Sequence, residues 1–455
     1  MAPPDLEATD PPMIDIAALI ERQNPRRMLV RLVLISWLVT FFDGFDLNAI
    51  AFAAPYLSAQ YAFANSELAN IFIAGGAGSL LGGLVFGALG DRIGRRRAII
   101  GSVTAFGVLT LCHALCDRYW ELLVVRFLDG VAIGGAIPLT WSLSVEYVPM
   151  RVRATAVTLI MLGYGIGVSA AGPVSLQLLP RFGWQSIFVF GGVASLASAV
   201  LLISLLPESL RYLAAVGASP EQLRKSLQWL TSDRAGPGNA RLTFSEVPTS
   251  EKASWGPGAL FEGNLRWVTP LLWLGFASSS MTSFFFTTWG PIMFESLGFT
   301  RSTAAWALSM NSLASGIGAL ALMRLTDRAG VLSLALLPLA AIPFLLAIGL
   351  TPVSPAAFII MMGALQVFLG GSHYGITSIA GNFYPTPHRG LGSGWMSGMG
   401  KLGSILAPWL GGLLLGSLVP VRHTFLVLAL FPAVLAMCAV VVGMLERTGR
   451  LRQAV

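Results

Sequence analysis

Apolar residues in this chain fall into long runs that are separated by short polar segments. A run of about twenty residues is the length at which a helix crosses a hydrocarbon core about 30 Å thick. The runs lie at 32–55, 69–89, 97–116, 119–145, 153–179, 186–207, 266–290, 302–325, 331–351, 355–381, 390–418 and 423–445. This pattern predicts an all-α membrane protein with twelve transmembrane helices.

A polar stretch rich in Ser, Pro, Gly and charged residues divides these runs into two equal groups. We therefore expect two six-helix bundles that are joined by a central loop. The expected parts are an N-terminal segment at 1–31, a first bundle at 32–207, the central loop at 208–265, a second bundle at 266–445 and a C-terminal tail at 446–455.

The composition excludes an ordinary soluble enzyme. Charged residues make up 11% of the 455 residues, whereas a soluble domain contains about 25%. The three cysteines provide no disulfide framework. We expect neither a metal nor an organic cofactor.

Basic residues are distributed very unevenly between the two sides of the predicted bundles. Of the 29 Lys and Arg residues, 23 fall in the termini, the central loop and every second short loop, and 4 fall in the opposite loops. Loops rich in Lys and Arg face the cytoplasm in membrane proteins. Both termini and the central loop are thus expected in the cytoplasm, and the formal charge of +7 requires no nucleic-acid partner.

Several residues recur in the second half of the chain at one constant offset of 236 positions. The related pairs are Asp91 and Asp327, Arg92 and Arg328, Gly94 and Gly330, Gly134 and Gly370, Gly135 and Gly371, Pro149 and Pro385, and Arg153 and Arg389. Both halves begin on the same side, so the repeat is parallel, with a pseudo-two-fold axis along the membrane normal. In transporters built this way, the substrate site lies near the midplane between the halves.

Four charged residues lie inside the predicted spans. Asp43 and Asp46 belong to the first span, Arg126 to the fourth and Lys401 to the eleventh. An ionisable side chain at the bilayer centre costs at least about 2.5 kcal/mol, so it usually faces a cavity and has a function.

Asp43 and Asp46 are three residues apart and therefore share one helix face. Repulsion between the two carboxylates, together with desolvation, favours a proton on one of them. Our hypothesis is that Arg126, at a similar depth, pairs with this acidic face when it is deprotonated and is released when a proton binds. Asp129 can share the charge of Arg126. The alternative is a static ion pair that holds two helices together.

Lys401 is the leading candidate to bind a substrate carboxylate. Its neighbourhood, 398–403, contains three glycines but lacks the spacing of a phosphate-binding loop. A lysine that snorkels to the interface or pairs with a distant acid is the alternative. Aromatic side chains and a histidine in the second half suit a flat anionic solute, although lipid-facing or packing roles are open for each of them. These candidates are Phe285, Trp289, His373, Tyr374 and Trp395.

The basic loops carry candidate gating residues. The segment 90–97 reads Gly-Asp-Arg-Ile-Gly-Arg-Arg-Arg, and a solvated basic loop is the simple interpretation of it. The segment recurs in part at 327–330, which favours a gate whose residues change partners between conformations. Glu146 is a further gate or a packing contact for Arg153. The candidates are Asp91, Arg92, Gly94, Arg95, Glu146, Arg153, Asp327, Arg328 and Arg389.

Several of these motifs resemble those of a known family. The segment 90–97 is similar to the loop signature of the major facilitator superfamily, and Pro207-Glu208-Ser209 resembles the end of its sixth helix. Asp43-Gly44-Phe45-Asp46 is similar to the first-helix element of the aromatic acid:proton symporters. Further similarities lie at 14–20, 126–138, 146–149, 382–385 and 394–396.

This resemblance implies proton-coupled uptake of a benzoate-like or hydroxybenzoate-like carboxylate by alternating access in a bacterial inner membrane. It implies that the first-helix aspartates and Arg126 are essential, that the proton is the coupling ion and that the protein works as a monomer. Two residues depart from the family pattern. Lys401 stands where arginine is expected, and Asp129 stands where a small or hydroxyl residue is expected. Both departures leave the particular substrate open.

Two other function classes compete with this interpretation. The first is a porter of another solute, such as the aliphatic diacid muconate, or a facilitator. The second is a membrane-embedded enzyme or a sensor. Ser315-Gly316 with His373 superficially suggests a serine protease, but position 313 is Leu where a nucleophile turn needs Gly. An enzyme also leaves the 236-residue repeat unexplained.

Overall fold

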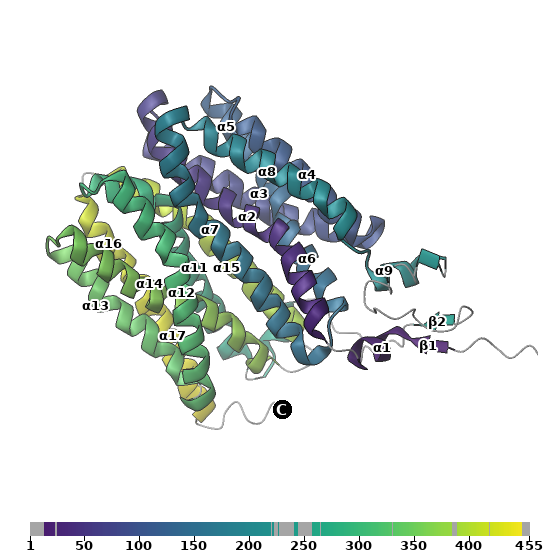
Figure 1. The fold of residues 1–455 in the computed structure, drawn as a ribbon. Coiled ribbons are helices and arrows are strands. Elements are labelled where there is room, and N and C mark those ends of the chain that lie inside the picture. Colours follow the sequence, from purple (N-terminus) through teal and green to yellow (C-terminus); the bar gives the residue numbers. More distant parts are fainter. Residues whose placement is uncertain are drawn as a thin grey trace, which may run out of the picture.

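The structure is a computed structural model that describes residues 13–22, 25–219, 221–222, 226, 241–243, 257–263, 265–329, 331–384, 389–417 and 419–447. Long helices form two neighbouring groups, coloured purple to teal and green to yellow in Figure 1. The first group contains α2 (Pro25–Tyr61), α3 (Asn65–Ile93), α4 (Arg95–His113), α5 (Tyr119–Gly134), α6 (Ala136–Glu146), α7 (Arg153–Phe182) and α8 (Gln185–Leu205). The second contains α11 (Leu265–Ser296), α12 (Arg301–Ala329), α13 (Leu336–Leu350), α14 (Pro355–Phe383), α15 (Arg389–Leu415), α16 (Thr424–Leu428) and α17 (Leu430–Arg447).

Each predicted span corresponds to one of these helices or to two consecutive ones. Within the described residues, 9 helices are long and apolar enough to cross a membrane. The other three long segments, α4, α11 and α12, are more polar: α4 begins with three arginines at 95–97, and α11 carries three serines at 278–280. The helices therefore occupy the positions that the apolar runs predict.

Glycine determines where two of the helices break. Gly94, between α3 and α4, has a φ of +97°, which a residue with a Cβ rarely adopts. Gly135 separates α5 from α6, and a Cβ on it would lie 2.1 Å from Cβ of Phe86. A larger residue at either position would have to shift its neighbours.

The 236-residue repeat is visible in the packing of the helices. A Cβ on Gly82 of α3 would meet the carbonyl oxygen of Val131 on α5 at 2.1 Å. At the same offset, a Cβ on Gly318 of α12 would meet the carbonyl oxygen of Val367 on α14 at 1.8 Å. A second pair of contacts follows the same relation, namely Gly134 with Ser79 and Gly370 with Ser315. The two halves thus share one packing scheme, as a pseudo-two-fold relation requires.

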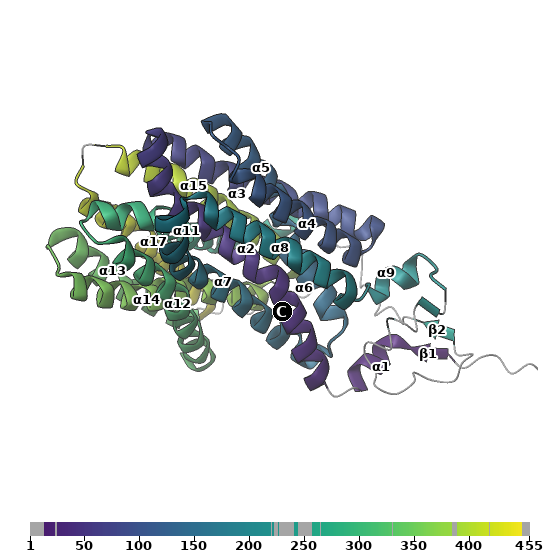
Figure 2. The same cartoon turned by 45° about the horizontal axis from the view of Figure 1, so that its top comes forward.

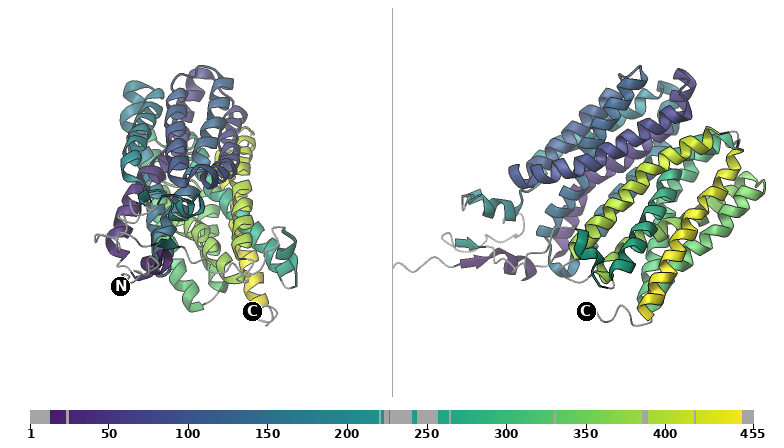
Figure 3. Two further views of the ribbon diagram at one scale, coloured as in Figure 1. Left: turned by 90° about the vertical axis from the view of Figure 1, so that its right-hand side faces the viewer. Right: turned by 180° about the vertical axis from the view of Figure 1, so that it is seen from behind.

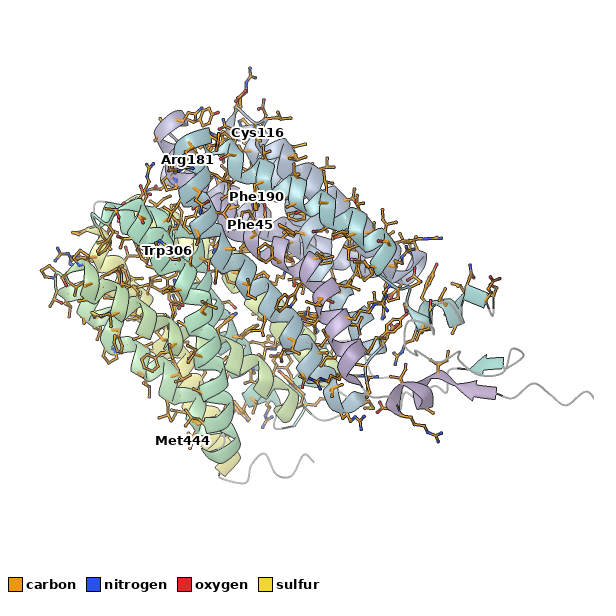
Figure 4. All side chains as sticks on the ribbon, in the orientation of Figure 1. Phe45, Cys116, Arg181, Phe190, Trp306 and Met444 are labelled. Atoms are coloured by element: carbon orange, nitrogen blue, oxygen red, sulfur yellow. The ribbon has the colours of Figure 1, made fainter. Side chains whose placement is uncertain are left out.

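The two halves are in contact at one end of the bundle and separate at the other. We call the end that holds 90–97 and Met444 the basic end, and the end that holds Cys116 and Arg181 the opposite end (Figure 4). Toward the opposite end, one apolar cluster joins both halves, for example through Phe72 and Trp289, whose rings lie 5.5 Å apart. At the basic end, the described apolar residues form two clusters, each confined to one half. Figure 3 shows the two groups of helices from two further sides.

Short elements lie beyond the basic end of the helices (Figure 2). They comprise β1 (Met13–Asp15), α1 (Ile16–Arg22), α9 (Leu210–Ala215) and β2 (Arg241–Thr243), and β1 pairs with β2 in parallel. The 3-10 helices are η1 (Met150–Val152), η2 (Pro257–Phe261), η3 (Val331–Ala335) and η5 (Val421–His423). Ile16 and Ile20 are buried against the first half, and Glu21 accepts a hydrogen bond from the N–H of Met150 at 2.7 Å. The strand pair was not expected, because strands of three residues carry no usable periodicity.

Candidate functional site

A buried guanidinium lies at the centre of the first half. Nη1 of Arg126, on α5, donates to Oδ2 of Asp46 on α2 at 2.5 Å and to Oδ2 of Asp129 on α5 at 3.1 Å. The exposed fractions of the three residues are 6% for Arg126, 2% for Asp46 and 0% for Asp129. The structure thus brings together the two helices that carry the charged residues of the first half.

This cluster is not electrically balanced. One guanidinium serves two carboxylates, and among the described residues Oδ1 of Asp46, Oδ1 of Asp129 and Nε of Arg126 have no hydrogen-bond partner. At an effective dielectric constant of about 20, two like charges about 4 Å apart repel each other by about 4 kcal/mol. Two ionised carboxylates are therefore unfavourable here, and a proton on one of them relieves the repulsion.

A glycine lets Arg126 reach across to α2. A Cβ on Gly75 of α3 would lie 2.7 Å from Nε of Arg126, so only glycine leaves room for this side chain. Around it, α3 and α5 pack backbone to backbone, because a Cβ on Gly130 would lie 2.2 Å from the carbonyl oxygen of Gly75. Small residues permit such close approach of membrane helices.

Gly75→Ala is expected to lower the thermal stability, because overpacking costs about 1–3 kcal/mol. Gly87→Ala on the same helix is the matched control, since a Cβ there meets nothing within 4 Å. Both variants gain helix propensity, by about 1 kcal/mol. The difference in melting temperature between the two variants therefore measures the effect of displacing Arg126. Equal melting temperatures in the two variants would contradict the expectation.

The second half has no counterpart of this cluster. By the 236-residue offset, Asp46 corresponds to Thr282, Arg126 to Met362 and Asp129 to Leu365. Met362 and Leu365 are fully buried in the apolar cluster that joins the halves. The same fold thus packs well without these charges, so the cluster in the first half is a specialisation of that half.

Lys401 of α15 reaches across the boundary between the halves. Its Nζ donates to Oγ of Ser79 on α3 at 2.7 Å, and the residue remains exposed. Asp43 on α2 is half-buried and interacts electrostatically with Lys401, Asp46 and Arg126. Accordingly, an exposed lysine and a half-buried aspartate lie beside the buried cluster.

The structure places two of the candidate aromatic residues in the apolar core. Trp289 is fully buried, and its indole N–H already donates to the carbonyl of Pro408 at 3.1 Å. Phe285 is fully buried as well and contacts Phe286 edge to face. In this conformation both residues help to close the opposite end, and neither offers a free surface to a substrate.

The remaining candidates of the second half have different environments. Nδ1 of His373 lies 3.1 Å from Oγ of Ser279, and its ring stacks on Phe276 at 5.2 Å. Trp395 is 41% exposed and stacks on Trp273. The side chain of Tyr374 lies outside the described residues. Oγ of Ser315 donates to the carbonyl of Asn311 at 2.7 Å, so it is not paired with His373 as a protease would require.

The gating candidates of the first half form a network at the basic end. Arg95 pairs with Glu146, and Glu146 also accepts a hydrogen bond from Oγ of Ser209 at 2.6 Å. Nε of Arg153 donates to the carbonyl of Val148 at 3.4 Å, and the packing contact of Arg153 with Glu146 stays a prediction. Arg153 begins α7 and is directed at the preceding loop, whereas Glu146 faces the start of α4.

Of the other gating candidates, Asp91 and Arg92 are exposed, Gly94 is buried, and the rest have side chains outside the described residues. Asp91 and Arg92 are exposed, and the hydroxyl of Tyr212 donates to the carbonyl of Arg92 at 3.4 Å. Gly94 lies against the carboxylate of Glu208, which a Cβ would approach to 2.6 Å. The side chains of Asp327, Arg328 and Arg389 lie outside the described residues.

Sequence reasoning missed four residues that the structure joins to these sites: Gly75, Ser79, Glu208 and Ser209. Glu208 accepts hydrogen bonds from the N–H groups of Arg96 at 3.0 Å and Ser209 at 2.9 Å. The Pro-Glu-Ser motif at 207–209 was a usable signal for the last two. Gly75 and Ser79 gave no signal, because small residues are common in every membrane helix.

Comparison with known sequences identifies relatives that span nearly the whole chain. The 4-hydroxybenzoate transporter PcaK of Pseudomonas aeruginosa is 31% identical over 97% of this chain and 97% of its own length. The gallate transporter of Pseudomonas putida is 30% identical over 94% of this chain and 95% of its own length. The benzoate transport protein of Acinetobacter baylyi is 27% identical over 90% of this chain and 88% of its own.

Solved structures show the same fold. A bacterial homolog of the human lysosomal transporter Spinster, in an inward-facing and occupied conformation, superposes with a TM-score of 0.67 at 16% identity, covering 93% of this chain and 98% of that one. The xylose transporter XylE from Escherichia coli, in a partially occluded inward open conformation, gives a TM-score of 0.68 at 15% identity, covering 90% and 96%.

The fold class and the family resemblance predicted from the sequence are therefore confirmed. The profile of the Major Facilitator Superfamily matches residues 36–328 and 271–454. With its apolar helices, the chain is a multi-pass membrane protein. It belongs to the Major Facilitator Superfamily, whose members are transporters and not enzymes.

Proposed function

We propose that this protein imports an aromatic carboxylate of the benzoate or hydroxybenzoate class together with protons, by alternating access. The observation that carries the proposal is the buried contact of Arg126 with Asp46 inside a transporter fold. The printed names of the relatives, which include 4-hydroxybenzoate, gallate and benzoate transporters, support the substrate class.

In this proposal, proton coupling arises because a proton and the guanidinium of Arg126 compete for the carboxylate of Asp46. While Asp46 is ionised, it holds the guanidinium at 2.5 Å. A proton on Asp46 removes this charge-assisted hydrogen bond and frees the guanidinium to change its partner. Asp43 is half-buried and interacts electrostatically with Lys401, Asp46 and Arg126, so it serves as a further proton acceptor beside the cluster.

Lys401 supplies the attraction for the substrate anion. The residue is exposed, and among the described residues its ammonium group donates a hydrogen bond to the hydroxyl of Ser79. A carboxylate that replaces this neutral partner adds the attraction between two opposite charges to the hydrogen bond. Because Lys401 and Ser79 belong to different halves, substrate binding at this point couples to their relative movement.

The basic end is the cytoplasmic end in this proposal. Its loops carry most of the arginines, as expected for cytoplasmic loops of a bacterial inner-membrane protein. Both termini then lie in the cytoplasm, and the contact between the halves at the opposite end closes the outer side. The protein works as a monomer in the bilayer, with a small organic anion and protons as its partners.

Uptake by proteoliposomes tests the proposal. Radiolabelled 4-hydroxybenzoate is offered with and without an inward proton gradient, and protein-free liposomes correct for passive distribution of the weak acid. We expect accumulation above the protein-free level only with the gradient, and inhibition by benzoates but not by aliphatic diacids. Uptake that only equilibrates would identify a facilitator. No uptake by folded protein, or inhibition by muconate alone, would overturn the aromatic class.

Lys401→Met is expected to raise the KM for the aromatic acid by about tenfold to a hundredfold. The physical reason is the loss of a hydrogen bond to a charged group, which contributes about 1.5–3 kcal/mol. Lys401→Arg keeps the charge and is the control that should retain most of the affinity. Initial uptake rates over a range of substrate concentrations measure the effect. An unchanged KM in Lys401→Met would remove Lys401 from the substrate site.

A further inference from the structure

Two polar contacts cross the boundary between the halves at the opposite end of the bundle. The guanidinium carbon of Arg301, the first residue of α12, lies 4.2 Å from the centre of the Tyr56 ring on α2. Nδ2 of Asn65, the first residue of α3, donates to the carbonyl oxygen of Leu415 on α15 at 2.8 Å. We call these the two latch contacts. Neither contact takes part in the sites described above.

The internal repeat relates the two latch contacts to each other. Asn65 and Arg301 are separated by the same 236 positions that relate the two halves. Each begins the second long helix of its half, and each reaches a residue of the other half. The residue types differ, but both are polar and both serve the same boundary. One latch contact therefore joins α2 to α12, and the other joins α3 to α15.

An ion pair within the second half orients Arg301 toward Tyr56. Nε of Arg301 donates to Oε2 of Glu295, near the end of α11, at 3.3 Å. The side chains of Arg301 and Glu295 are 47% and 26% exposed. Such an exposed pair contributes little stability by itself. Because it does not involve the first half, it can hold the guanidinium in place whether or not the ring of Tyr56 is beneath it.

We propose that the two latch contacts hold the opposite end closed and set the fraction of molecules in which this end is open. In alternating access, the two halves rock against each other, and they must separate at this end to open it. Both latch contacts join residues of different halves, so opening breaks both of them. The inference rests on the alternating access of the proposed function, but it does not depend on which solute is carried.

The strength of these contacts suits a gate that has to open in every cycle. A cation–π contact at an exposed site changes an equilibrium constant by about two- to fivefold. A neutral hydrogen bond changes it by about two- to tenfold. The two latch contacts share no residue, so their effects multiply, to about four- to fiftyfold when both are removed. The apolar contact of Phe72 with Trp289, which is unchanged in such variants, supplies further closure.

A buried cysteine can report how often the opposite end opens. Ser309 of α12 is 5% exposed, and its Oγ would lie 2.1 Å from a Cβ on Gly172 of α7, in the contact between the halves. Ser309→Cys replaces one oxygen by sulfur. Its rate of reaction with a water-soluble maleimide, measured on purified protein without substrate, is proportional to the open fraction when closing is faster than labelling. The same protein without Ser309→Cys measures the background from Cys112, Cys116 and Cys438.

Removing a latch contact is expected to accelerate this labelling. Arg301→Gln should raise the rate about two- to fivefold, and Asn65→Ala should raise it about two- to tenfold. The double variant should show the product of the two effects. Tyr56→Leu should match Arg301→Gln, whereas Tyr56→Phe keeps an aromatic face for the guanidinium and should change the rate little. An unchanged rate in the double variant would overturn the proposal.

Matched controls separate the latch from the mere loss of a charge or an amide. Arg422→Gln removes another exposed arginine at the same end of the second half. Asn70→Ala removes an amide from α3 that donates to the hydroxyl of Tyr119 within the first half, at 3.1 Å. Both variants should label at the rate of the wild type. An acceleration in these controls equal to that of Arg301→Gln and Asn65→Ala would overturn the proposal.

Two further outcomes separate opening from unfolding and the latch from the proposed function. Gly75→Ala lowers the stability without touching a latch contact, so equal acceleration in that variant would show that labelling reports unfolding and would overturn the latch. Labelling needs no substrate. Labelling rates as expected, in a protein that takes up no aromatic acid, would support the latch and overturn the proposed function.

Discussion

Asp46→Asn is expected to abolish proton-driven accumulation of the substrate, leaving the internal concentration at the level of protein-free liposomes. Each coupled proton supports about tenfold accumulation for each unit of pH gradient. An asparagine cannot bind and release a proton, so this contribution is lost. Its carbonyl oxygen still accepts a hydrogen bond from Arg126, so we expect the variant to fold and to exchange labelled for unlabelled substrate.

Asp117→Asn is the matched control for this experiment. Asp117 is exposed at the opposite end, where one oxygen accepts a hydrogen bond from the hydroxyl of Tyr61 at 3.3 Å. The same chemical change there should leave accumulation intact. Accumulation against a gradient that persists in Asp46→Asn would return the contact between Asp46 and Arg126 to a static role in holding α2 and α5 together.

Arg126→Leu is expected to reduce both transport and stability strongly. The substitution leaves two buried carboxylates without their shared cation, and breaking a buried ion pair costs about 3–5 kcal/mol. We expect the uptake rate to fall by at least about a hundredfold and the melting temperature in detergent to fall clearly. Uptake assays and thermal unfolding of the purified variant measure the two effects.

The charge of the cluster can be rebalanced to separate these two effects. The triple variant Arg126→Leu, Asp46→Asn, Asp129→Asn removes the cation together with both acids. It should recover thermal stability but not proton-coupled uptake. Arg118→Leu, at the exposed start of the same helix α5, is the control for loss of an arginine. A stable, transport-active Arg126→Leu would refute the assignment of Arg126.

The sequence by itself determined the membrane architecture and the residues of functional interest. A helix must be apolar over the thickness of the bilayer, and this is a local property of the chain. Glycine breaks such as Gly94 are local as well. Asp43, Asp46, Arg126 and Lys401 stood out because an ionisable side chain inside a membrane helix is costly.

Only the tertiary structure decided which of these residues meet. Asp46 and Asp129 share one nitrogen of Arg126. This is possible because Gly75 of α3 leaves room for the side chain of Arg126, which reaches from α5 to α2. Glu146 contacts Arg95 and Ser209, and Trp289 lies in the core. Such pairings depend on the rotation and crossing of packed helices. The side chains of many distant residues set these angles together, and no local sequence pattern records them.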